Sequence, residues 1–111
     1  MKPENILLDI DGNIKLTDFG LSKKLENDEA GYSFCGSPEY MSPEMILKKG
    51  HDYGVDYYGL GALLYEMMFG YPPFYSEDTN KMYRDIVEKR LTFPQTIKIT
   101  QELESLLQDL L

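Results

Sequence analysis

The chain of 111 residues has little cysteine and no long apolar run. Its one cysteine, Cys35, cannot form an internal disulfide or a thiolate metal cage, and no signal-peptide pattern opens the chain. A reducing, intracellular (cytoplasmic) setting is therefore expected. The most apolar stretch, residues 55–69, contains Asp56 and Glu66. It is too short and too charged to span a bilayer, so no membrane insertion is expected.

Basic residues are also scarce, because 11 Lys and Arg face 19 Asp and Glu, which gives a formal net charge of −8. Nucleic acids and anionic membranes are bound mainly through clustered Lys and Arg. The composition therefore argues against both as the main partner and favours a cationic one. The 42% hydrophobic content is enough for one domain with a core of its own.

The order of the sequence patterns predicts an α+β, mostly helical fold, with one β-hairpin followed by helices. Residues 6–8 and 14–16 are short apolar runs, and Asp11-Gly12 between them predicts a two-residue hairpin loop. Residues 20–41 follow neither the helix nor the strand period. A loop of that length is usually functional or disordered.

Helix starts are predicted at three capping signals: Ser42-Pro43-Glu44, Ser76-Glu77-Asp78 and Thr100. Lys48-Lys49-Gly50 is expected to close the first of these helices. Between them, residues 55–69 are apolar almost all round, which predicts a helix surrounded by protein. The last helix carries a stripe of leucines at 103, 106, 107, 110 and 111, and nothing in the sequence is obviously assigned to cover it.

The hairpin also suggests a metal site. With Asp11 and Gly12 as the loop, Asn5 lies directly opposite Asp18, and opposed Cα atoms are about 4.5–5.5 Å apart. A carboxylate and a carboxamide with room for water and phosphate suit magnesium. The alternative, that both residues merely end the strands, stays open.

Several motifs in order resemble the eukaryotic protein kinases: Lys2-Pro3-Glu4-Asn5, Asp18-Phe19-Gly20, Gly36-Ser37-Pro38-Glu39-Tyr40, Ser42-Pro43-Glu44 and the stretch 56–61. Residues 33–36 and 70–75 are similar to the AGC group of Ser/Thr kinases. The resemblance covers essentially all 111 residues. It implies a partial large lobe, with the end of the catalytic loop, a magnesium-binding hairpin, an activation segment at 18–44 and a helical subdomain at 45–111.

The resemblance implies ATP- and Mg²⁺-dependent phosphoryl transfer to protein Ser or Thr, with Lys2, Asn5 and Asp18 catalytic and Asn5 and Asp18 holding Mg²⁺. It assigns the nucleotide site to Glu4, Leu7, Thr17 and Asp18. Strand alternation, however, puts Leu7 on the face of Asn5 and Thr17 on the opposite one.

The chain also departs from the family pattern. The family's catalytic base lies in a His-Arg-Asp motif before the position of Lys2, so this chain is expected to lack it. The small lobe and the end of the large lobe are also expected to be absent from this chain, and the small lobe is an expected partner. A late Arg of the family pairs with the residue matching Glu44. Ser42 replaces Ala, Ser37 replaces a Thr that contacts the base, and Tyr58 replaces Trp. The isolated chain is therefore expected to be nearly inactive.

Ser33 is the expected activation-loop phosphosite, with Lys23 as the cation available to its phosphate and an upstream kinase as activator. An ordinary loop serine is the alternative. Asp56 is expected to be structural, at a helix start where the dipole favours an acid.

Glu66 is the one acid in the middle of the apolar helix, so it needs a partner. This partner is either a structural cation or an outside cation in a cleft. The resemblance implies that Glu66 and Glu4 receive an arginine of the substrate, with Ser37 also at the substrate site. Peptides with basic residues are therefore the expected substrates.

Two other functions compete. Calcium binding by Asp9-Ile10-Asp11-Gly12-Asn13 fails, because an EF-hand loop needs Gly at its sixth position and Glu at its twelfth, where this chain has Ile14 and Gly20. The second alternative is a non-catalytic kinase fragment, or a truncated gene model, that binds partners through the uncovered leucine stripe.

Overall fold

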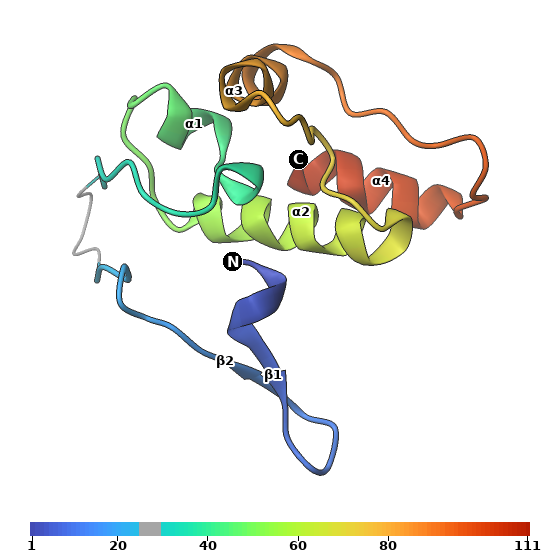
Figure 1. Cartoon of the computed structure of the whole chain (residues 1–111), viewed down its shortest axis with the longest axis horizontal. Coiled ribbons are helices and arrows are strands. Elements are labelled where there is room, and N and C mark those ends of the chain that lie inside the picture. The colour runs from blue at the N-terminus through green and yellow to red at the C-terminus, as the bar shows by residue number, and fades with distance from the viewer. Residues whose placement is uncertain (25–29) are drawn as a thin grey trace.

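A computed structural model describes residues 1–24 and 30–111, so residues 25–29 of the expected activation segment lie outside the described residues. The elements are a 3₁₀ turn at Pro3–Asn5, β1 (Ile6–Leu8), β2 (Ile14–Leu16), a 3₁₀ turn at Pro38–Tyr40, α1 (Pro43–Ile46), α2 (Gly54–Phe69), α3 (Thr79–Glu88) and α4 (Gln101–Leu110). The β1–β2 hairpin projects away from the helices, and α2 lies between the hairpin and the other helices (Figure 1). The predicted α+β, mostly helical fold is confirmed.

The hairpin forms where the sequence predicts it, but its loop is one residue longer than expected. The backbone N–H of Asp9 donates to the carbonyl of Asn13 at 2.9 Å, so three residues, 10–12, form the loop. Gly12 supplies a positive φ of 81°, and the Asp9 carboxylate accepts the N–H groups of Asp11 and Asn13. The turn is therefore built by an Asp side chain as well as by Gly.

This loop changes the strand register. Leu7 pairs with Lys15, and Thr17 N–H donates to the carbonyl of Asn5 at 2.8 Å. Asn5 therefore lies opposite Thr17, and the expected pairing of Asn5 with Asp18 is wrong. A one-residue slip moves side chains to the other face of a strand. Thr17 consequently lies on the same face as Leu7, contrary to the prediction from the shorter loop.

The helix starts follow the predicted caps, with one exception. Asp78 accepts the N–H groups of Asn80 and Lys81, and Thr100 accepts that of Leu103. Ser42 stands at the N-cap of α1, but its side chain makes no capping hydrogen bond and is fully buried. Helix α1 therefore begins at Pro43 without a side-chain cap. It ends at Ile46, before the Lys48-Lys49-Gly50 stop that the sequence predicts.

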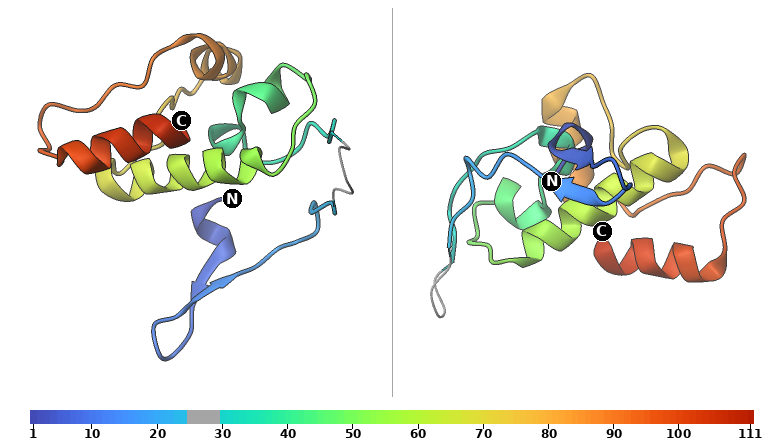
Figure 2. Two further views of the ribbon diagram at one scale, coloured as in Figure 1. Left: turned by 180° about the vertical axis from the view of Figure 1, so that it is seen from behind. Right: turned by 90° about the horizontal axis from the view of Figure 1, so that it is seen from below.

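The leucine stripe of α4 packs against α2, so the expectation of an uncovered stripe is wrong. The two helices lie side by side (Figures 1 and 2). Leu107 is fully buried with Tyr65 and Phe69, while Leu106 stays 48% exposed. A second cluster joins Tyr58 of α2 to Met82 and Ile86 of α3. The leucine pattern of α4 is thus used inside the fold.

The helix α2 is buried on one side only. Ala62 is fully buried, whereas the side chains of Tyr57, Leu60, Met67 and Met68 are exposed, Met67 to 66%. The prediction of a helix surrounded by protein is therefore wrong within the part of the chain that the structure describes.

The loop of residues 30–37 is joined to the segment before α2 by a backbone bridge that the sequence did not predict. Gly31 and His51 exchange two hydrogen bonds, of 2.7 and 2.9 Å. A Cβ at position 31 would lie 2.6 Å from the His51 ring, so any other residue there would require this ring to move. Among the described residues, no helix is both long and apolar enough to cross a membrane.

Candidate functional site

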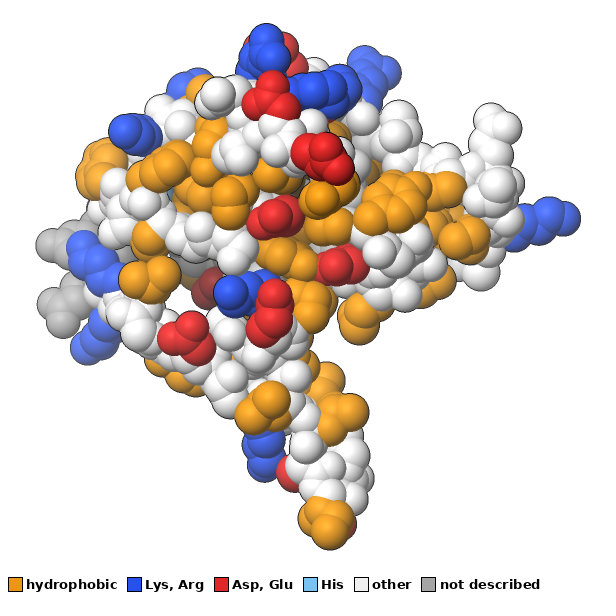
Figure 3. All heavy atoms as spheres, viewed as in Figure 1, with side chains coloured by type: hydrophobic (Ala, Val, Ile, Leu, Met, Phe, Trp, Pro, Cys, Tyr) orange, Lys and Arg blue, Asp and Glu red, His pale blue; other side chains and the backbone are white. Residues whose placement is uncertain are grey.

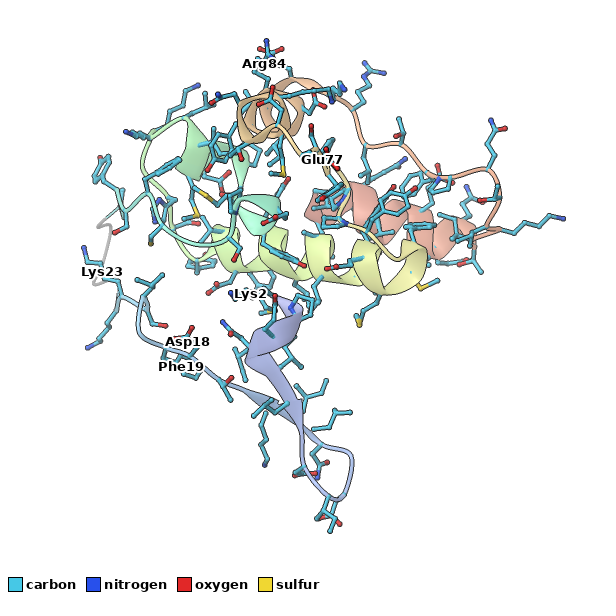
Figure 4. All side chains as sticks on the ribbon, in the orientation of Figure 1. Lys2, Asp18, Phe19, Lys23, Glu77 and Arg84 are labelled. Atoms are coloured by element: carbon cyan, nitrogen blue, oxygen red, sulfur yellow. The ribbon has the colours of Figure 1, made fainter. Side chains whose placement is uncertain are left out.

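The end of the hairpin away from its loop carries all three of the predicted catalytic residues. Lys2 precedes the Pro3–Asn5 turn, and Asn5 N–H donates to the Lys2 carbonyl at 3.1 Å. Thr17, bonded to the Asn5 carbonyl through both its N–H and its hydroxyl, is followed directly by Asp18. Lys2 and Asp18 lie at this same end of the hairpin (Figure 4). The backbone thus brings Asn5 and Asp18 together without placing them opposite each other.

Asp18 leaves the strand conformation, since its φ is 61°. Strand alternation therefore no longer decides where its side chain points. One carboxylate oxygen lies 3.4 Å from the N–H of Gly20, a weak turn contact, and the side chain is exposed. A positive φ at a residue other than Gly costs of order 1–3 kcal/mol and is concentrated at functional sites.

The donor set fits magnesium. Asp18 offers an exposed carboxylate and Asn5 a half-buried amide, and hard cations such as Mg²⁺ take oxygen ligands and keep several waters. Among the described residues, no group of three or more His, Cys, Asp or Glu side chains could hold a metal by itself. A site with two protein ligands therefore needs further oxygens, such as those of phosphates and water.

The face of the hairpin that carries Leu7 also carries Thr17. Leu7 is 53% exposed, and Thr17 is half-buried with its hydroxyl donating to the Asn5 carbonyl at 3.1 Å. Both residues assigned to the adenine pocket by resemblance therefore share one surface, next to Asn5.

A second group of acids surrounds Tyr40, to which the sequence patterns assigned no role of its own. The Tyr40 hydroxyl donates a hydrogen bond to the Glu66 carboxylate. Partial burial raises the pKa of Tyr40, with further contributions from its bond to Glu66 and from the negative charges of Glu4 and Glu39. Glu4 and Glu66, 62 positions apart in the sequence, thus act on one phenol.

The partner of Glu66 is therefore a hydroxyl. A phenol hydrogen bond satisfies one carboxylate oxygen but does not neutralise its charge. The site keeps a surplus of negative charge from Glu4, Glu39 and Glu66. The motif Gly36-Ser37-Pro38-Glu39-Tyr40 contained Tyr40, but only the fold shows that it meets α2.

Ser33, the expected phosphosite, is exposed, and its neighbour Phe34 packs on the helical part of the chain. The Phe34 ring meets Tyr83 of α3 edge-on at 5.8 Å, and the Lys48 ammonium lies 5.4 Å from its centroid. Lys48 is therefore a cation beside residues 33–34 that the sequence did not indicate. Lys23, the expected partner, has interactions of its own.

The remaining predicted residues lie on the helical side. Ser37 is the residue before the Pro38–Tyr40 turn, and its carbonyl accepts Tyr40 N–H at 3.0 Å. Asp56 is exposed in the first turn of α2. Burial raises the pKa of Tyr58, with a smaller contribution from the charge of Glu44.

The comparisons with known proteins agree with the motifs. The family model described as "Protein kinase domain" matches residues 1–111. Over the whole chain, 50% of residues are identical to Protein kinase 2 of Dictyostelium discoideum, of which the chain covers 23%. Identity to human Serine/threonine-protein kinase Sgk2 is 48%, with 96% of this chain and 30% of the relative covered. Mouse cGMP-dependent protein kinase 2 is 46% identical over 99% of the chain and 14% of its own length.

The chain belongs to the protein kinase family, and its relatives are Ser/Thr kinases that include AGC members. The resemblance drawn from the motifs is therefore confirmed. The chain spans less than a third of the length of these relatives.

Proposed function

We propose that the chain is the part of a Ser/Thr protein kinase that holds the magnesium ion and the phosphates of ATP and receives a basic protein substrate. The observation that carries the proposal is the meeting of Lys2, Asn5 and Asp18 at one end of the hairpin, with Asp18 in a left-handed conformation. The whole protein would act inside the cell.

The residues at this end would act by charge and position. Phosphoryl transfer depends mainly on orientation and on stabilising charge that develops on the phosphate oxygens. Asp18 and Asn5 would hold the metal ion, which neutralises phosphate charge when bound, and Lys2 would stabilise the transferring γ-phosphate.

The nucleotide would lie on the face shared by Leu7 and Thr17. Leu7, an exposed apolar side chain, would contact the adenine ring, and the Thr17 hydroxyl lies beside it. Glu4 is adjacent to Asn5 and belongs to both the nucleotide and the substrate assignments. The small lobe of the family and its His-Arg-Asp base would complete the site in the whole domain.

The substrate would present an arginine to Glu4 and Glu66. The charges of both acids contribute to the raised pKa of Tyr40, which supports the view that they lie close to each other. A guanidinium binds carboxylates through paired, charge-assisted hydrogen bonds, which are stronger than neutral ones. Ser37, which precedes the Tyr40 turn, would lie beside the acceptor hydroxyl. An Arg upstream of the acceptor Ser or Thr is therefore the proposed specificity.

An upstream kinase would activate the protein at Ser33. A phosphate there adds nearly two negative charges. Lys48, beside Phe34, and Lys23, the cation named from the sequence, are the candidates to bind it. Glu44 and Asp56 would serve the structure, Glu44 by pairing with an Arg outside the described residues.

The test is transfer of labelled γ-phosphate from ATP to an Arg-containing Ser peptide by the full-length protein. Asp18→Asn removes the metal-binding charge, and the expected loss of kcat is at least about 100-fold, the order seen when a catalytic electrostatic group is removed. Asp11→Asn is the matched control, because Asp11 is an exposed acid of the same hairpin. Equal activity of the two variants would show that Asp18 does not hold the metal.

A further inference from the structure

Tyr32 and Tyr53 are the two most exposed tyrosines of the chain, each 71% exposed. Tyr32 lies in the loop directly before Ser33, and Tyr53 is the N-cap residue of α2. Neither hydroxyl makes a hydrogen bond with the described residues. Both hydroxyls are therefore within reach of a modifying enzyme, and the two sites differ mainly in the charges around them.

Tyr32 is held against the loop that follows α1. The two hydrogen bonds between Gly31 and His51 fix the backbone on one side of it. A Cβ built on Gly50 would lie 3.3 Å from Cε1 and 3.4 Å from Cζ of Tyr32, so the ring edge that carries the hydroxyl lies against Gly50. Phe34, two residues further on, is anchored to α3. The position of Tyr32 is thus set by contacts on both sides.

Two lysines come directly before Gly50 in this loop. The Lys48 ammonium lies 5.4 Å from the centroid of the Phe34 ring, so it faces the segment that carries Tyr32. Lys49 is exposed, and its ammonium makes no ion pair or hydrogen bond with the described residues. In the space-filling view, Lys and Arg side chains lie beside α1 at the left edge of the molecule, where no described Asp or Glu is visible (Figure 3). The hydroxyl edge of Tyr32 therefore adjoins a positively charged segment in a chain of net charge −8.

The surroundings of Tyr53 have the opposite charge. Asp52 precedes it, and the Asp52 carboxylate accepts the N–H of Gly54 at 2.7 Å. The Tyr53 ring meets that of Tyr57 edge-on at 6.4 Å, and Asp56 lies in the same first turn of α2. A phosphate on Tyr53 would be repelled by these acids, whereas one on Tyr32 would be attracted by lysines.

We propose that Tyr32 is a phosphorylation site for a tyrosine-specific protein kinase, and that its phosphate pairs with Lys49 and Lys48. The Tyr32 oxygen forms the new bond to the γ-phosphorus of ATP, the bond from that phosphorus to the bridging oxygen breaks to release ADP, and the phenolic proton passes to the base of the modifying enzyme. The phosphate brings nearly two negative charges and three acceptor oxygens, which suit ammonium donors. It would link the loop of Tyr32 to the loop after α1, beside the existing backbone bridge.

The first test asks whether the modification occurs. Full-length protein is isolated from its own cells after treatment with a tyrosine-phosphatase inhibitor and analysed by mass spectrometry. We expect a phosphopeptide whose fragment ions place the phosphate on Tyr32 and not on Ser33, and we expect none at Tyr53 in spite of its equal exposure. Tyr32→Phe should abolish the signal. Detection of both tyrosine peptides in unmodified form only, or equal modification of Tyr32 and Tyr53, would overturn the proposal.

The second test asks whether the phosphate pairs with Lys49. Full-length protein with phosphotyrosine incorporated at position 32 is compared with the unmodified protein by hydrogen exchange at Gly31 and His51, the two residues of the bridge. Exchange should slow about threefold, within the range for one exposed charge pair. Lys49→Gln should remove most of this slowing. Lys98→Gln is the matched control, because it is the same charge change at an exposed residue of the loop before α4, and it should keep the slowing.

Phosphotyrosine incorporated at position 53 should not slow exchange at the bridge. Equal exchange in the phosphorylated and unmodified proteins, or equal slowing in Lys49→Gln and Lys98→Gln, would contradict the pairing. Because the readouts are modification and hydrogen exchange, a failure here is separate from a failure of the proposed kinase activity.

Discussion

The hydroxyl of Tyr40 donates a hydrogen bond to the carboxylate of Glu66, and this bond joins the loop before α1 to the middle of α2. It also brings the mid-helix acid that the sequence left without an assigned partner into one group with Glu4 and Glu39. The phenol satisfies an oxygen of Glu66 without neutralising it, so the charge stays available to a cationic ligand.

The first prediction concerns this acid. Glu66→Gln keeps a hydrogen-bond acceptor for Tyr40 but removes the charge, so the KM for an Arg-containing peptide should rise about tenfold with little change in kcat, as for the loss of a charge-assisted hydrogen bond. Steady-state kinetics of the full-length protein measure both constants. Glu102→Gln, an exposed acid of α4, is the control. An unchanged KM in Glu66→Gln would contradict the substrate assignment.

The contact between α2 and α4 gives a stability prediction. Leu107→Ala, at a fully buried position between Tyr65 and Phe69, should lower the free energy of unfolding by about 2–5 kcal/mol. Leu106→Ala is the same substitution one residue earlier, on a side chain that is 48% exposed, and should cost about 0.5 kcal/mol or less. Denaturant unfolding of both variants measures the difference, and equal losses would mean that the helices do not pack this way.

The hairpin turn should respond to acid. The backbone N–H of Asn13 holds the pKa of Asp9 below its usual value, so the folded turn binds the proton less readily than the unfolded chain. Its contribution is fully present above the unfolded pKa of about 3.9 and is lost as the pH falls through the lower folded value. Hydrogen exchange at Gly12 and Asn13 should therefore speed up, relative to intrinsic rates, below about pH 4.

Two variants separate this effect from general acid unfolding. In Asp9→Asn the exchange at Gly12 and Asn13 should no longer depend on this titration, whereas Asp11→Asn should keep the wild-type dependence. If both variants showed the same acid-induced change in exchange, the titrating group would not be Asp9.

The activation prediction concerns Ser33. In protein isolated from activated cells, mass spectrometry should find a phosphopeptide containing Ser33, and Ser33→Ala should lower activity at least about tenfold, because an ordering phosphate makes one to three charge-assisted hydrogen bonds. Ser22→Ala, an exposed serine of the same segment, should have no effect. Full activity of Ser33→Ala would leave Ser33 as an ordinary loop residue.

The local signals in the sequence predicted most of the elements. The strands at 6–8 and 14–16, the caps at Asp78 and Thr100, and the end of the apolar helix at residue 69 all depend on side chains near in sequence, and the structure has each of them. The ordered motifs identified the family for the same reason, since each motif is a short run whose residues do chemistry together.

The local signals gave a wrong prediction for the pairing of the two strands, because the pairing depends on whether the loop has two or three residues. Asp11-Gly12 favoured a two-residue loop, but the Asp9 carboxylate accepts the N–H groups of both Asp11 and Asn13, and this favours three. The slip separates Asn5 from the position opposite Asp18 and unites Leu7 with Thr17 on one face.

The sequence by itself determined the family and the types of most elements, and it named the residues proposed to do the chemistry, because these follow from residue identity and spacing. Only the tertiary structure decided that Tyr40 binds Glu66, that Leu107 of α4 packs against Tyr65 and Phe69 of α2, and that the Tyr65 hydroxyl donates to the Thr92 carbonyl. Each is a contact between segments far apart along the chain, and no local pattern records which distant side chain fills a given space.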